Sequence, residues 1–463
     1  MNLVRSRLTV LATLPLFLLA AGCSERDPSD LPQARAPIDP VVYDDGQGGD
    51  SALLQGDVYF QPFSGTYIEA LVPVTDQAYE SAQSLQVTVP GLNSPLGAYA
   101  GGVLTAVGVR DFADFNALTF YARSSQNSTL NEVGYGNDNT GTSVYTAGRS
   151  NVPLTTDWTF VVVPIPDPSK LIAERGLFMF AEGWESSAGH KIWFDSIRFA
   201  NLGNITNPRP SMPTVDKEYF VGASVSLAGT ATTYDIDGAD VTVNHMPGYF
   251  DYSVSDPSVA QVTDGAVHVI GVGETTVTAR LGAIEATGAV TVNGKQAPAG
   301  PAPTPTHPAA DVVSLFSDAY TDSPVESWNP HWQWSTTEDG LFELDGDQAR
   351  MYSSLNFVGI VFQSTPVDAS TMTHLHLDVY APEGTSFLVK LVAFNGAGGA
   401  AIGNKELTFN ADSTPAFTAG GWSSLEIPMA DFGFTVSTAA LGQLVLSSPD
   451  ASLVLVDNIY WHR

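Results

Sequence analysis

The sequence predicts an all-β protein of about three domains. The chain has 463 residues, and roughly 150 residues per domain is a usual ratio. After the first two dozen residues no long window has helical periodicity, whereas short alternating segments are separated by Gly, Pro and Asp. The clearest alternation occurs twice, at residues 192–199 and 455–461, around Asp195 and Asp457. Period-two alternation indicates a strand with one face in a core, so each segment is predicted to close a β-sandwich.

The order of elements before these two segments is also repeated. A Trp-containing strand precedes each one, at residues 158–164 and 422–428, and Pro and Asp residues typical of turns follow it. The same order twice indicates a duplicated domain. Trp158 and Trp422 begin regular apolar strands, so both are predicted to be core residues.

The N-terminus combines Arg5 and Arg7, an apolar run at 8–21 that is too short to span a bilayer, and the small-residue sequence Ala20-Ala-Gly-Cys23. It resembles a bacterial lipoprotein signal peptide. The resemblance implies a signal peptide at 1–22, a lipidated Cys23, a disordered polar tether at 23–37 and, through Ser24, anchoring at the outer membrane facing the cell surface. Cys23 is the only cysteine, which excludes an internal disulfide. A buried free thiol is the alternative.

The composition excludes some partners. The formal net charge is −30, which repels phosphate backbones and anionic lipid headgroups, so nucleic acid is not an expected partner. An acidic surface also suits solubility in saline media, and this simpler interpretation remains open.

Residues 38–203 are predicted to form the first sandwich. Its most distinctive motifs are the run Asn131-Glu-Val-Gly-Tyr-Gly-Asn-Asp138 and the sequence Phe180-Ala-Glu-Gly183. They lie between a Tyr-Asp-Asp start and the Trp-Phe-Asp closing strand. These motifs, in this order, resemble the jelly-roll carbohydrate-binding-like modules of marine and gut bacterial surface lipoproteins.

Two connecting segments follow. Residues 208–294, with Ser255-Asp-Pro-Ser258 and the strand-like 271–279, resemble the bacterial immunoglobulin-like group 2 domain, which implies a small β-sandwich acting as a spacer. Residues 295–311 are rich in Pro. Such a run favours polyproline II, so it is predicted to be a stiff spacer of about 40 Å that keeps the flanking domains apart.

Residues 312–463 are predicted to form the second sandwich. Residues 313–321, the sequence Trp328-Asn-Pro-His-Trp332 and the closing strand resemble the C-terminal module appended to laminarinases. The resemblances together imply two jelly-roll β-sandwiches separated by the small immunoglobulin-like sandwich.

Sugar binding in water needs exposed aromatic planes beside hydrogen-bonding groups. In the second sandwich the predicted carbohydrate-binding residues are Trp328, His331, Trp332, Trp334 and Trp461. In the first they are Trp184 with Glu182, and Tyr135 beside Asn137 and Asp138. Core packing is the alternative for each aromatic ring, and it weighs most for Tyr135, which alternates along a probable strand.

The sandwich resemblance also implies structural calcium near the first and last strands. It places Asp457 with Asp318, and Asp195 with Asp44 or Asp45. The alternative is that each Asp caps a turn or bonds a neighbouring strand. A second pair, His374 and His376, shares one strand face, but a zinc site usually needs at least three protein ligands, so these two are predicted to be packed or at the surface.

No catalytic motif was found, and no catalytic cofactor is expected. Retaining laminarinases carry Glu-x-Asp-x-x-Glu, which does not occur here, and Glu343-Leu-Asp-Gly-Asp347 lacks its last Glu. The sequence therefore predicts a non-catalytic surface lipoprotein that captures polysaccharide, a β-glucan such as laminarin, for degrading enzymes and outer-membrane importers. The alternatives are an adhesive or structural surface protein and an accessory glycoside hydrolase or lyase.

Overall fold

The computed structural model describes residues 35–44 and 57–463. Its regular elements there are strands and short 3-10 turns, so the all-β prediction is confirmed, and antiparallel sheets form sandwiches. The predicted signal peptide, Cys23 and Asp45 lie outside the described residues. Within the described ranges no helix is long and apolar enough to cross a membrane.

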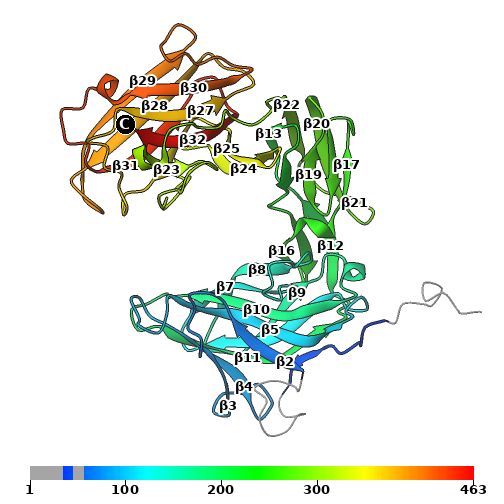
Figure 1. Ribbon diagram of the computed structural model, residues 1–463. Coiled ribbons are helices and arrows are strands. Elements are labelled where there is room, and N and C mark those ends of the chain that lie inside the picture. Colours follow the sequence, from blue (N-terminus) through cyan, green and yellow to red (C-terminus); the bar gives the residue numbers. More distant parts are fainter. Residues whose placement is uncertain (1–34, 45–56) are drawn as a thin grey trace, which may run out of the picture.

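Two sheets face each other in the N-terminal part (Figure 1). Sheet 1 has the order β3-β4-β11-β6-β9, with β1 on β11. Its strands are β1 (Val41–Tyr43), β3 (Leu71–Val74), β4 (Ser84–Val89), β6 (Ala117–Ser124), β9 (Thr159–Pro164) and β11 (His190–Ala200). Sheet 2 contributes β2 (Val58–Pro62), β5 (Tyr99–Arg110), β7 (Ser128–Tyr135), β8 (Ala147–Leu154) and β10 (Glu174–Gly183). A 3-10 turn, η2 (Pro168–Lys170), precedes β10.

Sheet 2 continues beyond the predicted first sandwich. Its full order is β12-β15-β16-β8-β7-β10-β5-β2, and the added strands are β12 (Ile205–Ser211), β15 (Ala231–Ile236) and β16 (Ala239–His245). The junction pairs Asn244 with Gly148 and His245 with Ala147. Tyr234 and Tyr249 pack into the N-terminal core. Residues 205–207, which lie between the two predicted domains, therefore belong to β12 of a sheet that both parts share.

The rest of the middle segment forms two small sheets. Sheet 3 has the order β13-β22-β20-β17 with β21 on β20, and sheet 4 has the order β14-β19-β18. Their strands are β13 (Val215–Phe220), β14 (Ser224–Ser226), β17 (Asp251–Val254), β18 (Ala260–Thr263), β19 (Ala266–Val269), β20 (Gly273–Leu281), β21 (Ile284–Glu285) and β22 (Val290–Lys295), and η3 (Pro247–Tyr249) precedes β17.

The C-terminal sandwich again has two sheets. Sheet 5 has the order β24-β25-β32-β27-β30 with β23 on β32, and sheet 6 has the order β26-β31-β28-β29. Their strands are β23 (Val312–Phe316), β24 (Glu338–Leu344), β25 (Asp347–Ser353), β26 (Phe357–Val361), β27 (His374–Tyr380), β28 (Ser386–Phe394), β29 (Ala401–Asn410), β30 (Trp422–Pro428), β31 (Leu441–Ser447) and β32 (Val454–His462). The turn η4 (Ala309–Asp311) precedes β23, and η5 (Met429–Phe432) lies between β30 and β31.

The two predicted closing segments lie in β11 and β32, which are interior strands of sheets 1 and 5. Both strands are irregular at the same point, because the residue after the central Asp has a positive φ: 49° at Ser196 and 50° at Asn458. Their register with the neighbouring strands shifts there. A shared bulge at equivalent positions agrees with the duplication that the sequence indicates.

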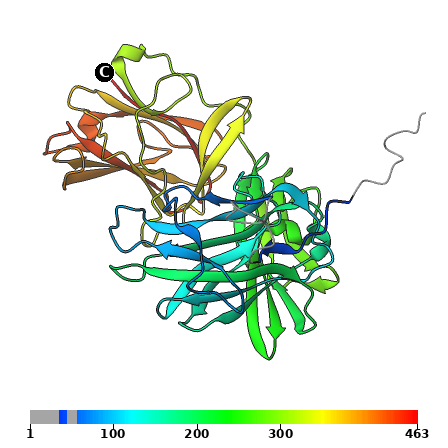
Figure 2. The ribbon, with the colours of Figure 1, turned by 90° about the horizontal axis from the view of Figure 1, so that it is seen from below.

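The middle and C-terminal parts pack against each other. Phe220 of β13 contacts Phe342 at 5.6 Å and Tyr380 at 5.7 Å between ring centroids, and apolar residues of β25 and β32 complete one shared core. Lys295 pairs with Glu383 at 2.8 Å across the same junction. Figure 1 shows the middle strands joining the two sandwiches, and Figure 2 shows that the first described residues and the C-terminus lie on opposite sides of the molecule.

The Pro-rich segment does not hold the flanking domains apart, as predicted, but lies along the outer face of sheet 5. Its backbone carbonyls accept hydrogen bonds from that face: Gln296 from Tyr380 (2.9 Å), Gly300 from Trp422 (2.9 Å) and Pro303 from Asn458 (3.1 Å). A polyproline II chain has no internal hydrogen bonds, so its carbonyls are free to accept them. The spacer prediction was wrong because the surface that binds this segment is on another part of the chain.

Candidate functional site

A group of contacting aromatic rings lies on the outer face of sheet 1, outside the core. Along β6, Leu118, Phe120 and Ala122 face the core, so Tyr121 and Arg123 face outward. In the strand register, Tyr121 lies opposite Phe160 of β9 and opposite Asp195 of β11. Arg123 lies opposite Trp193 of β11. We call the group the aromatic platform; it consists of Tyr79, Tyr121, Arg123, Trp158, Phe160 and Trp193.

The platform rings are held in contact with one another. Tyr79 stacks on Tyr121 with centroids 3.6 Å apart and meets the edge of Trp158 at 6.0 Å. Phe160 lies 5.1 Å from Tyr121 and is 48% exposed. The side-chain hydrogen bond with Tyr121 raises the pKa of Tyr79 to about 12, so its hydroxyl stays neutral at ordinary pH. The arrangement offers flat apolar rings with a hydroxyl beside them.

Polar side chains fix the platform from the sides. The Arg123 guanidinium lies over Trp158 at 5.9 Å and over Trp193 at 5.5 Å, and it donates to Gln77 at 2.6 Å. The Tyr79 backbone N–H donates to Asp195 at 2.7 Å. These contacts order the rings before any ligand arrives, which lowers the entropy cost of binding.

This platform was not predicted, and Trp158 was predicted to be a core residue. Trp158 is only partly buried and makes its contacts on the outer face. Strand parity could have shown this, because Val161 and Val163 point into the core, which places Phe160 and, two residues earlier, Trp158 on the other face. Trp422 is likewise outside the C-terminal core and packs at the junction with the middle part.

The three tryptophans predicted at 328–334 differ in how far they are buried. Trp328 is partly buried against Phe316 at 5.6 Å and under Arg350 at 4.6 Å, so it is a packing residue. Trp332 covers the outer face of sheet 6 at Gly359, where a side chain would collide with the indole. Trp334 is 80% exposed, and His331 is exposed.

Hydrogen bonds hold this loop against β26. Ser335 Oγ donates to the Phe357 carbonyl at 2.8 Å, and Asn356 Nδ2 donates to the Trp334 carbonyl at 2.8 Å. Trp332 and Trp334 therefore form a second, smaller aromatic surface at the edge of sheet 6, which we call the loop tryptophans.

Three predicted carbohydrate-binding residues are buried, and the prediction is corrected for them. Trp461 is 0% exposed in the C-terminal core. Tyr135 is 0% exposed and donates to the Pro164 carbonyl at 3.1 Å. Glu182 is 0% exposed and lies 3.3 Å from His190. Each side chain points into the protein because of its strand parity. Trp184, in the loop after β10, is 50% exposed.

The predicted calcium ligands of the first sandwich have other partners. Asp44 accepts from Arg198 at 3.1 Å, and the cationic guanidinium opposes a metal ion there. Asp195 accepts from the Tyr79 N–H and from Ser81 at 3.0 Å. These bonds agree with the alternative in which each Asp bonds neighbouring groups, and calcium at Asp44 and Asp195 stays a prediction.

In the second sandwich the predicted pair lies in a group of carboxylates. Asp318, Asp345 and Asp347 line a hollow of about 290 Å³ together with Pro301 and Thr304 of the Pro-rich segment. Burial and the neighbouring carboxylates raise the pKa of Asp457 to about 7, and burial and Asp318 raise the pKa of Asp347 to about 6. Oxygen ligands that repel one another in this way fit a hard cation such as Ca²⁺.

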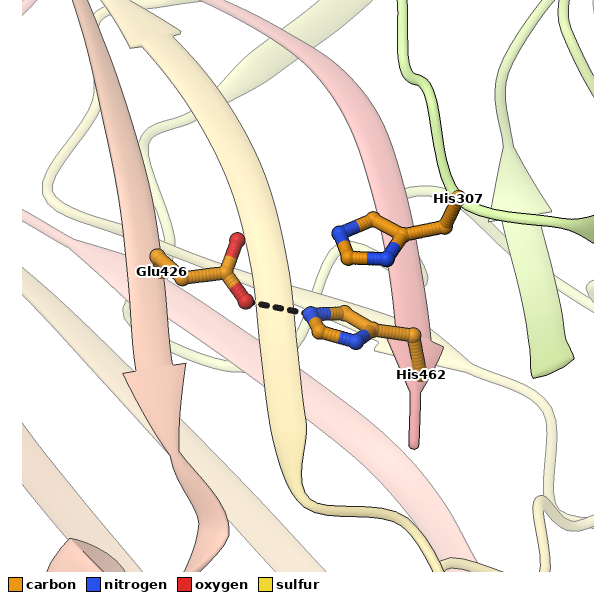
Figure 3. A group of neighbouring side chains, drawn as sticks. All are labelled: His307, Glu426 and His462. Atoms are coloured by element: carbon orange, nitrogen blue, oxygen red, sulfur yellow. Dashed lines mark hydrogen bonds and ion pairs between the residues drawn. The ribbon is translucent and has the colours of Figure 1, made fainter.

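A histidine cluster lies at the far end of the outer face of sheet 5 (Figure 3). His307 comes from the Pro-rich segment, Glu426 from β30 and His462 from β32. The predicted strand pair, His374 and His376, lies beside them: His374 stacks on His462 with centroids 5.2 Å apart, and His376 Nδ1 is 2.7 Å from Glu426 Oε2.

The contacts in this cluster favour a positive charge on His376 and a negative charge on Glu426. Burial acts to lower the pKa of His376, but contacts with Asp378 and Glu426 outweigh it and raise the pKa to about 9. Burial acts to raise the pKa of Glu426, but hydrogen bonds with His376 and His462 outweigh it and lower the pKa to about 2. Glu426 is therefore a carboxylate at neutral pH.

Comparisons with known proteins give structural similarity only. No protein-family model and no curated protein matches the sequence. Parts of the chain are structurally similar to carbohydrate-binding modules. A family 11 module of a Clostridium thermocellum cellulosomal cellulase matches with TM-score 0.23 and 11% identity over 28% of this chain and 83% of the module. A family 30 module from the same organism matches with TM-score 0.23 and 17% identity over 36% of this chain and 96% of the module.

A longer match also exists. A β-1,2-glucanase from Parabacteroides distasonis matches with TM-score 0.25 and 13% identity over 56% of this chain and 39% of the enzyme. At these identities and TM-scores, the similarity alone assigns no ligand and no activity to this chain.

Proposed function

We propose that the protein binds polysaccharide without cleaving it and that the aromatic platform is its main contact surface. The observation that supports this most is the set of ordered, partly exposed rings Tyr79, Trp158 and Phe160 on one sheet face. Sugar rings have apolar faces that stack on such planes and hydroxyls that bond to polar groups beside them. The resemblance of the C-terminal module to those of laminarinases favours a β-glucan such as laminarin.

The loop tryptophans supply a second contact on the other sandwich. A long glycan carries many repeats, so two linked surfaces raise its effective concentration at the second surface once the first is occupied. We propose that this retention holds glycan for separate degrading enzymes and outer-membrane importers.

Trp158→Ala and Phe160→Ala are each expected to weaken glycan binding about 10- to 100-fold, which is about 1.4–2.8 kcal/mol. Affinity electrophoresis in gels containing laminarin, alginate, xylan or agar measures the effect. Trp184→Ala is the matched control, because this tryptophan is exposed but lies outside the platform. Trp334→Ala reports on the second surface.

Each outcome of this experiment separates the alternatives. Equal loss of retardation in Trp184→Ala would place the site elsewhere. Absence of retardation of folded wild-type protein in all four gels favours the adhesive or structural alternative. Release of soluble product from any glycan favours the hydrolase or lyase alternative.

We propose further that lipid on Cys23 anchors the protein at the outer membrane. The support is the signal-like sequence at 1–22. Cys23→Ser is expected to move the protein from the membrane fraction to the soluble fraction, as measured by immunoblotting after cell fractionation. Retention of this variant in the membrane fraction would contradict the anchor.

We also propose that Asp318, Asp347 and Asp457 hold a structural Ca²⁺. The ion would offset the mutual repulsion of the three carboxylates. Adding Ca²⁺ to chelator-treated protein is expected to raise the free energy of unfolding by about 1–3 kcal/mol, measured as a higher melting temperature. Asp318→Asn should weaken this response, whereas His331→Ala should retain it. A melting temperature that Ca²⁺ does not change would contradict the site.

A further inference from the structure

The histidine cluster joins two segments that are distant in sequence. His307 belongs to the Pro-rich segment, whereas Glu426 and His462 lie on β30 and β32 of sheet 5. The His307 ring lies face to face with His462, with centroids 3.8 Å apart, and Figure 3 shows both rings beside the Glu426 carboxylate. The Tyr320 hydroxyl donates to the His307 carbonyl at 2.9 Å and holds the segment in place.

The three side chains bring ligand atoms within metal-binding distance of one another, and because the two imidazoles are stacked, one ring must turn for both nitrogens to point at one ion. One imidazole nitrogen from each histidine and one Glu426 oxygen all lie within 4.8 Å of one another. His462 Nε2 already contacts Glu426 Oε1. Among the residues that the structure describes, neither ring nitrogen of His307 has a hydrogen-bond partner, and His462 Nδ1 is buried without one.

A second layer of residues orients the carboxylate. His376 Nδ1 lies 2.7 Å from Glu426 Oε2, the oxygen that does not contact His462. His376 Nε2 lies 3.3 Å from Asp378 Oδ2, and Asp378 is fully buried. Such a chain fixes the direction of a ligand before the metal arrives, as outer partners do in metal sites generally.

We propose that His307, His462 and Glu426 bind a divalent transition metal ion of the zinc class. Two imidazoles and one carboxylate form a common protein ligand set for Zn²⁺ that leaves a fourth position for water. Imidazole ligands also discriminate against Ca²⁺ and Mg²⁺, which prefer oxygen. The bound ion joins the Pro-rich segment to the last strand, so it clamps that segment on sheet 5.

A second group among the described residues is a weaker candidate metal site. Glu182, Glu185 and His190 also meet the spacing for a metal ion, but they supply a single imidazole. Backbone N–H groups already occupy one oxygen of each carboxylate, from Asn131 at 2.7 Å and from Thr129 at 2.6 Å. The cluster at His307 is therefore the stronger site for a soft or borderline ion.

Calorimetric titration of metal-free protein without a histidine tag tests the proposal. Wild-type protein is expected to bind one Zn²⁺, and His307→Ala is expected to bind it at least 30-fold more weakly. His307 is half-buried in a loop-like segment, so its removal should leave the melting temperature in chelator nearly unchanged. His331→Ala, an exposed histidine of the same module, is the matched control.

Two further measurements separate a built site from general surface binding. Co²⁺ should give visible d–d absorption in wild-type protein that His307→Ala and His462→Ala lose. Zn²⁺ should slow proteolysis within residues 296–310 in wild-type protein and not in His307→Ala. Absence of one-to-one binding, or binding that His307→Ala leaves unchanged, would overturn the proposal.

Discussion

Glu182→Ala is expected to lower the free energy of unfolding of the N-terminal sandwich by about 1–3 kcal/mol, the range for leaving a buried polar group without its partner. The side chains of Glu182 and His190 are both 0% exposed, with Oε1 and Nε2 3.3 Å apart. The contact lacks the geometry of a hydrogen bond. Without Glu182, the buried His190 imidazole loses its polar neighbour and the Asn131 N–H loses its acceptor.

Urea unfolding in chelator, followed by intrinsic fluorescence, measures this effect. Glu185→Ala is the matched control: it removes a nearby exposed carboxylate and should cost less than about 1 kcal/mol. The double variant Glu182→Ala/His190→Ala should cost less than the sum of the single variants because the residues interact. A loss below 1 kcal/mol for Glu182→Ala would show that the pair is not buried as described.

Periodicity was sufficient to predict the strands and the class of fold. The alternation around Asp195 and Asp457 predicts strands with one face in a core, and both segments are strands. Their interior positions in sheets 1 and 5 come from the structure. It did not predict which sheet face each aromatic ring uses in the first sandwich. Trp158 precedes an apolar strand in sequence, but its contacts are with Tyr79 and Arg123 from other elements.

Contacts between distant segments explain the other differences. The sequence at 295–311 indicates an extended chain, but nothing within it indicates that Tyr380, Trp422 and Asn458 donate to its carbonyls. For the same reason the pair at 374 and 376 gave no metal prediction. Glu426 and His462 share sheet 5, but His307 lies more than a hundred positions before either of them and reaches them only through the docked segment.

The junction between the N-terminal and middle parts contains a buried histidine that is expected to make its stability depend on pH. His245 ends β16, where that strand pairs with β8. Its Nδ1 donates to the Met246 carbonyl at 3.0 Å, and its Nε2 lies 3.1 Å from Thr232 Oγ1. Both ring nitrogens are thus satisfied in the neutral form. Tyr249 and Phe250 enclose the ring.

Burial lowers the pKa of His245 to about 4, whereas an unfolded histidine titrates near 6.5. Between these values the unfolded chain binds a proton that the folded chain does not bind, so stability falls as pH decreases from about 7 to about 4. The expected loss from this residue is about 3 kcal/mol, at about 1.4 kcal/mol per pKa unit.

Because carboxylates also titrate between pH 7 and pH 4, the quantity to measure is a difference between proteins. Urea unfolding of wild-type protein and of His245→Gln at pH 7 and at pH 4 gives it. The variant should lose about 3 kcal/mol less than wild-type protein over this interval. His268→Gln, at a half-buried position of β19, should behave as wild type. Equal losses in all three proteins would show that His245 is protonated in the folded state.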